Sequence, residues 1–374
     1  MKKQIILPAL VLLAVQTMAQ NVVIKGTFAG DTKGNNKIYI YGTGVKTDSA
    51  VMTDGHFEFT LPFEKLFMPL FYTEYDLNMT GGYVPYALVV DQAGTITLSG
   101  GDIAKGMSSM KISGMKSAEA FSQWGERQDS VSRQVQEQLK KKFGDKWYTQ
   151  DNPKIEEATK EYERLQRAGI SSELENFVRS HSDSYASAVA LNGVFSLLET
   201  SQLEKLYAML APQMQQTEEG KNIAKFMQGM KNSAIGSTVK DFTLNTPEEK
   251  PLSFSQLKGK YVLIDFWASW CGPCKQSFPH MKEIYKKYKS DKFEIYSISI
   301  DQDKKDWLKG LKEQELPWLQ ALDTKDISQS HFAVTGVPTT ILIDPAGKIL
   351  LKEVGFGGSD GPLDKKLREL FGTK

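Results

Sequence analysis

The sequence DFWASWCGPCK occupies residues 265–275 and decides the fold of the C-terminal part of the chain. It contains the only two cysteines of the 374-residue chain, Cys271 and Cys274, three positions apart. The apolar segment 261–266 before them predicts a buried strand, and residues 274–289 after them predict a helix. The two cysteines therefore stand where a strand gives way to a helix.

This position gives Cys271 a reason to be reactive. Unpaired N–H groups and the helix dipole at a helix N-terminus favour the thiolate, which is the nucleophilic form of cysteine. Cys274 lies one turn further along, close enough to form a disulfide, and we expect it to be the more buried of the two. We therefore expect Cys271 to attack a substrate disulfide and Cys274 to resolve the mixed disulfide.

Three other roles for the cysteine pair stay open but are less favoured. A zinc site needs four ligands, and the four histidines, His56, His181, His280 and His331, supply no ligand pair. A structural disulfide that closes so short a loop gains little entropy. A peroxidase is expected to show a Pro-x-x-x-Thr-x-x-Cys pattern, whereas Ala268 stands at the threonine position. We expect no metal and no other cofactor.

Strand and helix signals alternate on both sides of this junction. Strands are predicted over 293–300 and 319–322, a hairpin over 339–354, and helices over 304–314 and 363–371. This alternation around an apolar sheet is typical of an α/β domain.

These residues carry a resemblance to a known family. Residues 265–275 are similar to the active-site segment of thioredoxin, and Pro279 matches the helix-kinking proline of that family. Residues 336–340, GVPTT, look like the loop that carries its cis-proline. Residues 237–257 and 304–314 resemble the N-terminal hairpin and the insertion of the TlpA/ResA branch. The resemblance covers residues 233–374 and implies a thioredoxin fold with thiol–disulfide oxidoreductase activity.

The resemblance also implies roles for residues outside the cysteine pair. A cis Val337–Pro338 bond would face the cysteines and present backbone to a bound peptide. Asp265 would be the buried acid that moves a proton to or from Cys274. Trp267 and Trp270 would frame the disulfide. The residues that we expect to contact the substrate are Trp270, Gly272, Pro273 and Val337.

Two positions depart from the family pattern. Ser277 stands where ResA-type proteins carry an acid, three residues after the second cysteine. Ser297 stands where thioredoxin has a lysine near the buried acid, so Asp265 is expected to lack that partner.

The Gly272-Pro273 dipeptide between the cysteines is that of thioredoxin, whose potential is about −270 mV, against about −120 mV for the oxidant DsbA. It favours a reductase of disulfide-containing proteins, kept reduced by a membrane electron donor. Cytochrome c maturation is one target that the family implies.

Residues 1–19 predict a signal peptide, with Lys2 and Lys3 before an apolar run and cleavage after Ala19. We expect export to the periplasm or cell envelope, and no lipoprotein anchor because no cysteine lies near the cleavage site. The formal net charge of +1 gives no indication of a nucleic-acid partner.

Residues 20–115 predict an antiparallel β-sandwich-like domain, including a hairpin that joins 49–52 to 56–60 through Asp54-Gly55. Residues 116–232 predict a helical segment, with helices over 118–143, 152–168, 171–181 and 184–199. Both resemble the region that precedes TlpA-like thioredoxins in some Gram-negative envelopes. An alternative function is therefore a cell-envelope interaction protein, in which residues 21–232 have the main role and the redox domain is accessory. The sequence does not determine the oligomeric state.

Overall fold

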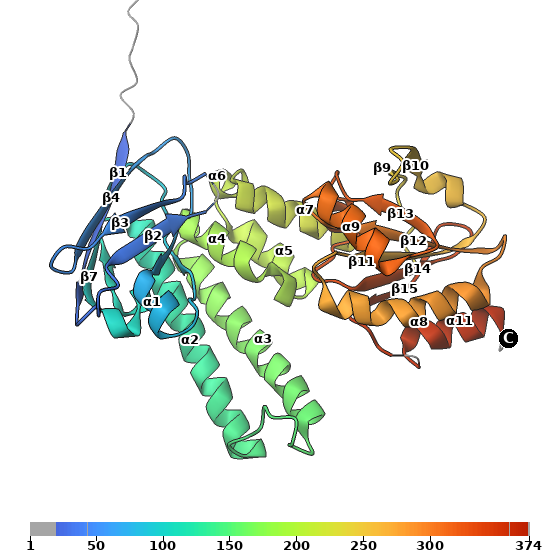
Figure 1. Cartoon of the computed structure of the whole chain (residues 1–374), viewed down its shortest axis with the longest axis horizontal. Coiled ribbons are helices and arrows are strands. Elements are labelled where there is room, and N and C mark those ends of the chain that lie inside the picture. Colours follow the sequence, from blue (N-terminus) through green and yellow to red (C-terminus); the bar gives the residue numbers. More distant parts are fainter. Residues whose placement is uncertain (1–19, 43, 359, 373–374) are drawn as a thin grey trace, which may run out of the picture. The chain divides into compact units, whose positions relative to one another are not determined.

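A computed structural model describes residues 20–42, 44–358 and 360–372 of the chain (Figure 1). The predicted signal peptide, residues 1–19, lies outside the described residues. The chain forms two compact units, one extending to Ala190 and the other beginning at Leu191. The predicted domain boundaries at 115/116 and 232/233 stay predictions. No helix of the described residues is long and apolar enough to cross a membrane.

The first unit contains two four-stranded sheets with the strand orders β4-β1-β7-β8 and β3-β2-β5-β6. Alternate residues of both sheets, such as Ile24 and Ile96 of one and Ile40 and Phe71 of the other, belong to one apolar core. The strands are β1 (Asn21–Ala29), β2 (Lys37–Tyr41), β3 (Asp48–Val51), β4 (His56–Pro62), β5 (Leu70–Thr73), β6 (Tyr86–Ala87), β7 (Gly94–Asp102) and β8 (Lys111–Ser113). The sandwich-like architecture is as predicted.

Two details of this β region differ from the prediction. Neighbouring strands run antiparallel except β1 and β7, which are parallel, because a connection long enough for a crossover separates them in the chain. The predicted hairpin through Asp54-Gly55 forms only at its tip, where Thr53 and His56 make an antiparallel bridge, and the strands beyond it do not pair with each other. A turn does form there, with a positive φ at both residues, but it leads from β3 in one sheet to β4 in the other.

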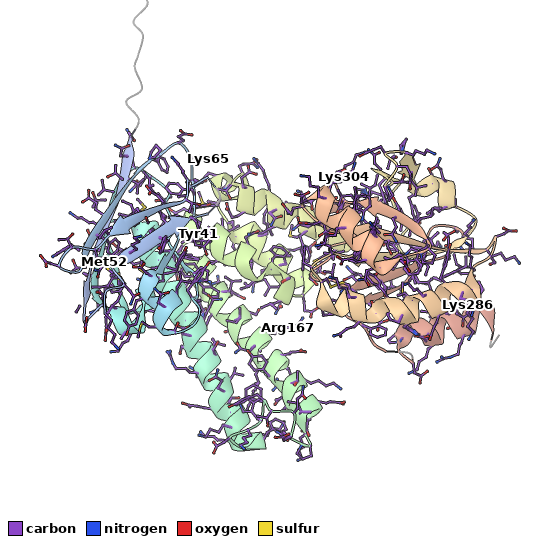
Figure 2. All side chains as sticks on the ribbon, in the orientation of Figure 1. Tyr41, Met52, Lys65, Arg167, Lys286 and Lys304 are labelled. Carbon is purple, nitrogen blue, oxygen red and sulfur yellow. A yellow bond between two sulfur atoms is a disulfide. The ribbon has the colours of Figure 1, made fainter. Side chains whose placement is uncertain are left out.

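The helices of the first unit are α1 (Glu74–Met79), α2 (Lys116–Phe143) and α3 (Ile155–Ser180), and α4 (Tyr185–Val194) spans the boundary after Ala190. Long polar side chains project from α2 and α3 along their length (Figure 2). The predicted break between helices at residues 168–171 is wrong, because α3 runs through it. Gly169 stays helical there and lets α3 approach Val131 of α2, where a side-chain carbon would collide.

The second unit is built on the five-stranded sheet β13-β12-β11-β14-β15. The first three strands are mutually parallel, and β14 and β15 are antiparallel to their neighbours. The strands are β11 (Tyr261–Trp267), β12 (Phe293–Ser299), β13 (Leu319–Leu322), β14 (Thr339–Ile343) and β15 (Ile349–Val354), and a separate hairpin pairs β9 (Thr243–Asn245) with β10 (Pro251–Ser253). The predicted strands are confirmed, as is the hairpin over 339–354.

Helices flank this sheet, and α8 and α11 lie side by side on one face (Figure 1). Met281 of α8 and Leu367 of α11 share a core with Leu263 of β11. The helices of the unit are α5 (Thr200–Met209), α6 (Pro212–Gln215), α7 (Glu218–Asn232), α8 (Gly272–Tyr288), α9 (Lys304–Gln314), α10 (Ile327–Ser330) and α11 (Pro362–Phe371). The predicted helices at 274–289, 304–314 and 363–371 are confirmed to within two residues.

Candidate active site

The cysteine pair lies where β11 leads into α8. Cys271 is the N-cap residue of α8, with an extended backbone (φ −80°, ψ 101°), and Pro273 follows inside the first turn. Its Sγ accepts a hydrogen bond from the backbone N–H of Cys274 at 3.1 Å. An N-cap side chain normally supplies an oxygen for this purpose. Here a sulfur takes that place, so negative charge on Cys271 would be stabilised by the helix N-terminus.

The two cysteines form a disulfide in the structure, with their Cα atoms 5.3 Å apart. Cys274 is completely buried, and Cys271 is 4% exposed. The residues that adjoin this nearly buried disulfide are exposed to solvent. Trp270 is 67% exposed, and Gly272 and Pro273 are also exposed. A partner would therefore meet the sulfur of Cys271 through this exposed rim.

The loop that precedes β14 faces the disulfide from the other side. The Val337–Pro338 peptide bond is cis. The Sγ of Cys271 lies 3.5 Å from the carbonyl oxygen of Val337, which is half-buried, while Pro338 is buried. The structure thus brings together the cysteines and the Val337–Pro338 loop, which are far apart in the sequence.

Apolar side chains pack beneath the disulfide. Trp267 is fully buried and packs edge-on against Phe278 of α8, with the ring centroids 5.4 Å apart. Trp307 of α9 joins the same cluster as both cysteines. Of the two tryptophans expected to frame the disulfide, Trp267 lies beneath it and Trp270 lies at the surface next to Cys271.

Asp265 is buried in the middle of β11, with 1% of its surface exposed. Residues that alternate along a strand share a face, so Asp265 faces the same side as Leu263 and Trp267, which is the side that α8 covers. Burial raises the pKa of Asp265 from 3.8 to about 6, and a hydrogen bond from Ser297 opposes that rise. A carboxyl group with this pKa can both take up and release a proton near neutral pH.

The two departures from the family pattern have clear local consequences. Ser297 donates a hydrogen bond from its Oγ to Oδ2 of Asp265 at 2.8 Å, and Trp318 donates its indole N–H to the same Oγ at 2.7 Å. Asp265 thus has a neutral partner in place of the family's lysine. Ser277 donates its hydroxyl to the carbonyl oxygen of Cys274 at 2.8 Å, so no acid of α8 occupies that position.

Asp301 belongs to the site but was missed in the sequence. Its carboxylate accepts hydrogen bonds from the backbone N–H of Ser269 at 2.9 Å, from the hydroxyl of Ser269 at 2.7 Å and from that of Ser299 at 2.6 Å. These bonds fix the loop that carries Trp270 and Cys271. The signal that could have found it is its place just after β12, because ligand and active-site residues gather at the carboxyl ends of neighbouring parallel strands.

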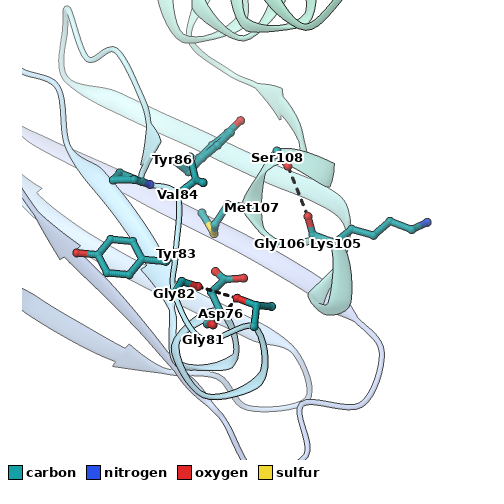
Figure 3. Close-up of a pocket in the computed structure, with 12 residues that line it drawn as sticks. Asp76, Gly81, Gly82, Tyr83, Val84, Tyr86, Lys105, Gly106, Met107 and Ser108 are labelled. Atoms are coloured by element: carbon teal, nitrogen blue, oxygen red, sulfur yellow. Dashed lines mark hydrogen bonds between the residues drawn. The ribbon is translucent and has the colours of Figure 1, made fainter. Parts of the chain in front are cut away.

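Another hollow, of about 530 Å³, lies in the first unit. Asp76, Tyr86 and Met107 are among its lining residues, with the loop Gly81–Gly82 at its edge (Figure 3). The carboxylate of Asp76 accepts hydrogen bonds from the backbone and hydroxyl of Thr73 and so serves to cap α1. Among the described residues of the chain, no three His, Cys, Asp or Glu side chains gather as a metal site would require.

Comparison with known proteins agrees with this geometry. Residues 235–352 match the sequence pattern of the AhpC/TSA family. The thiol-disulfide oxidoreductase ResA of Bacillus subtilis (strain 168) is 34% identical over 122 residues, which cover 33% of this chain and 68% of ResA. A ResA of Bacillus cereus is 33% identical over 121 residues, covering 32% of this chain and 70% of that protein.

Among solved structures, the thioredoxin domain of a thiol-disulfide oxidoreductase from Bacteroides vulgatus is 35% identical. The matched region covers 37% of this chain and 97% of that domain, with a TM-score of 0.34. The fold, the disulfide at a helix N-terminus and the ResA relatives define a thioredoxin-like thiol–disulfide oxidoreductase. Through its second unit, the chain belongs to the family of ResA-type thiol–disulfide oxidoreductases.

Proposed function

We propose that the chain is an exported reductase of protein disulfides that cycles Cys271 and Cys274 between dithiol and disulfide. The observation that carries this proposal is the position of the Cys271 sulfur, which caps α8 and lies 3.5 Å from the Val337 carbonyl. It is the one sulfur of the pair that is not completely buried. Substrate disulfides therefore reach Cys271 first.

The reductive half of the proposed cycle begins at Cys271. The Cys271 thiolate attacks one sulfur of a substrate disulfide, and the other substrate sulfur leaves as a thiolate that takes up a proton. Cys274 then gives its proton to Asp265 and attacks the Cys271 sulfur. The second substrate thiol is released, and two electrons have passed from the enzyme dithiol to the substrate. A dithiol electron donor restores the reduced enzyme.

The rim of the disulfide would hold the substrate. Trp270 offers an exposed aromatic surface beside Cys271, and Gly272 and Pro273 leave the approach free of bulky side chains. The backbone of Val337 lies opposite and can bind an extended peptide. Main-chain hydrogen bonds of this kind tolerate many sequences, so protein substrates of varied sequence fit the site.

A redox titration of the full chain against glutathione tests the direction of the reaction. A reductase is expected to have a potential near that of thioredoxin, about −270 mV. A value above about −180 mV, in the range of protein disulfide isomerase, would indicate an oxidant or isomerase and contradict the proposal. Capture of partners from the cell envelope by a Cys274→Ser variant would then identify the substrates and test the proposed location, with Cys271→Ser as the variant that captures none.

A further inference from the structure

A row of polar residues crosses the central sheet of the second unit at one level. Each strand contributes one residue, and each residue is paired in register with the next. Directly paired residues on adjacent strands point to the same face of a sheet. In strand order from β13 to β15 the row is Gln320, Ser297, Asp265, Thr340 and Glu353.

This row lies on the face that α8 covers. Residues two positions away along the strands, Leu263, Ile295 and Leu342, pack in the core that includes Met281 of α8. The sheet therefore carries a polar row through an otherwise apolar face, with Asp265 at its centre. A buried polar row of this kind calls for an explanation, because apolar residues would pack at lower cost.

On the side of β12 and β13 the residues of the row cannot pass the proton of Asp265 to solvent. Ser297 already donates its hydroxyl proton to Asp265, and its oxygen accepts the indole N–H of Trp318. An indole N–H is a donor only and cannot receive a proton. Gln320 at the end of the row is buried and cannot carry a proton onward.

On the side of β14 and β15 the row opens into a small cavity. Thr340 and Glu353 line it together with Ser277 of α8 and Pro338. Its volume of about 20 Å³ is enough for one water molecule. Ser277 donates a hydrogen bond to the carbonyl oxygen of Cys274, and Pro338 follows Val337, so two lining residues of this cavity adjoin the active site.

Glu353 is held at the edge of this cavity. The backbone N–H of Leu363, in the first turn of α11, lies close enough to its carboxylate to lower the pKa of Glu353. Gly357 makes room for that carboxylate, because a side-chain carbon there would collide with Oε1. The carboxylate of Glu353 thus lies between Gly357 and the first turn of α11.

The surroundings of Glu353 suit an acid that exchanges protons. Partial burial raises the pKa of its carboxyl group, the nearby Leu363 N–H opposes the rise, and the negative charge of Asp364 adds to it. The charged or titratable groups that share the cavity are His280 of α8 and Asp364 of α11, which hydrogen-bond to each other at 3.0 Å. Lys352 lies on the opposite face, where its Nζ donates to the carbonyl of Phe332.

We propose that Glu353 carries the proton of Asp265 to solvent through the hydroxyl of Thr340 and a water in the cavity. This inference rests on the proposed redox function. When Cys274 resolves a mixed disulfide, its S–H bond breaks and an O–H bond forms on Asp265. Asp265 passes that proton to Thr340, which gives its own proton to the water, and Glu353 takes one from the water and releases it. One proton moves, and no electron accompanies it. Glu353 is a positioning residue for the proton, since it does not touch the reacting sulfurs.

The test measures the two chemical steps separately in the reduced full chain mixed with oxidised glutathione. The Cys274→Ser background isolates the attack by Cys271, and the intact pair reports the resolution by Cys274. Glu353→Gln keeps an acceptor for the Leu363 N–H but cannot accept a proton. We expect it to slow resolution about a hundredfold at pH 6–7, at the low end of the range for a lost proton-transfer group, and to leave the attack unchanged. Thr340→Val is expected to slow the same step.

Chemical rescue distinguishes a proton path from a structural role. In Glu353→Ala, the resolution rate is expected to rise with the concentration of a small buffer such as imidazole, whereas the unmodified chain shows no such dependence. Glu369→Gln, an exposed acid of α11 paired with Lys366, is the matched control and is expected to change neither step.

The outcomes separate this proposal from the function on which it rests. Resolution at the normal rate in both Glu353→Gln and Thr340→Val would overturn the proton path and leave the reductase intact. Slow resolution without buffer rescue would assign Glu353 a purely structural role and also overturn it. If the unmodified chain formed no mixed disulfide at all, the proposed function itself would fail.

Discussion

The two units of the chain both bury a sheet-based core, but they treat buried polar groups differently. In the first unit, the buried polar side chains among the described residues are the hydroxyls of Thr73, Ser117 and Ser187. The second unit buries two carboxylates, Asp265 and Asp301. Burying a charge costs free energy unless it is well paired, so a fold keeps one where it serves a purpose. The difference indicates that the second unit buries carboxylates for its chemistry at a cost in stability, whereas the first unit does not.

The largest effect that this comparison predicts is on activity. Cys271→Ser removes the nucleophile, so we expect it to abolish reduction of insulin disulfides by the full chain. Cys274→Ser is expected to stop turnover too, but to accumulate mixed disulfides that a mass shift reveals. Residual turnover in Cys271→Ser would contradict the assignment of the attacking sulfur.

In the first unit we expect a large effect on stability and none on redox chemistry. Phe71 is fully buried, and Phe71→Ala leaves a cavity that costs about 3–5 kcal/mol of the free energy of unfolding. Urea denaturation measures that loss, and a glutathione titration of the folded variant is expected to return the unchanged potential. A shifted potential would mean that the units are not separate in function.

Replacing the buried acid Asp265 is expected to stabilise the chain, unlike Phe71→Ala, and the size of this gain depends on pH. The pKa of Asp265 rises from 3.8 to about 6 on folding, so the folded chain binds its proton more tightly than the unfolded chain. The contribution of Asp265 to stability is therefore greatest below pH 4 and falls as the pH rises from 4 to 6, by about 3 kcal/mol in all. Asp265→Asn does not titrate and is expected to regain that amount at pH 7 but nothing at pH 4.

Urea denaturation followed by tryptophan fluorescence checks this prediction, because four of the six tryptophans lie in the second unit: Trp267, Trp270, Trp307 and Trp318. Equal midpoints for Asp265→Asn and the unmodified chain at pH 7 would show that the acid carries no cost. The same variant is expected to slow resolution by Cys274, which connects the cost to the chemistry.

A smaller effect is expected when Ser297, the hydrogen-bond partner of Asp265, is replaced. Ser297→Ala removes the hydrogen bond that opposes the rise in the pKa of Asp265, so the pKa should move further above about 6. It also leaves the buried indole N–H of Trp318 without its acceptor, which costs about 1–3 kcal/mol. Titration of the Asp265 carboxyl by NMR measures the shift, and a lower pKa would contradict the arrangement.

The smallest effect on stability is expected at the rim of the disulfide. Trp270 is exposed, so Trp270→Ala should change the free energy of unfolding by less than about 0.5 kcal/mol. Its KM for a protein disulfide is expected to rise several-fold, while its rate with a small disulfide stays the same. An equal loss with both substrates would indicate that Trp270 acts on the sulfur itself.

What the sequence could predict depends on how close the interacting residues lie in the chain. The strand, the cysteines and the helix over 261–288 are contiguous, so local signals were enough to locate Cys271 at a helix N-terminus. The cis bond at Pro338 came from a motif. In contrast, the hydrogen bond from Ser297 to Asp265 depends on strand register, which a serine by itself does not indicate.

In the first unit the local turn chemistry of Asp54-Gly55 was correct, but the strand pairing inferred from it stops at the bridge between Thr53 and His56. A turn signal shows that the chain reverses, and it does not show whether the next strand joins the same sheet. Likewise, Gly169 lowers helix propensity, and only packing against α2 explains why α3 continues through it. Long-range pairing and packing decided the features that local sequence signals could not predict.

The most direct test of the central claim is the order in which the two thiols react. The full chain is reduced, treated with a limiting amount of iodoacetamide at neutral pH, and digested to find which cysteine carries the label. We predict that Cys271 is alkylated first, because its thiolate is stabilised at the N-terminus of α8 and Cys274 is completely buried. Labelling of Cys274 first, or of neither cysteine, would contradict this claim.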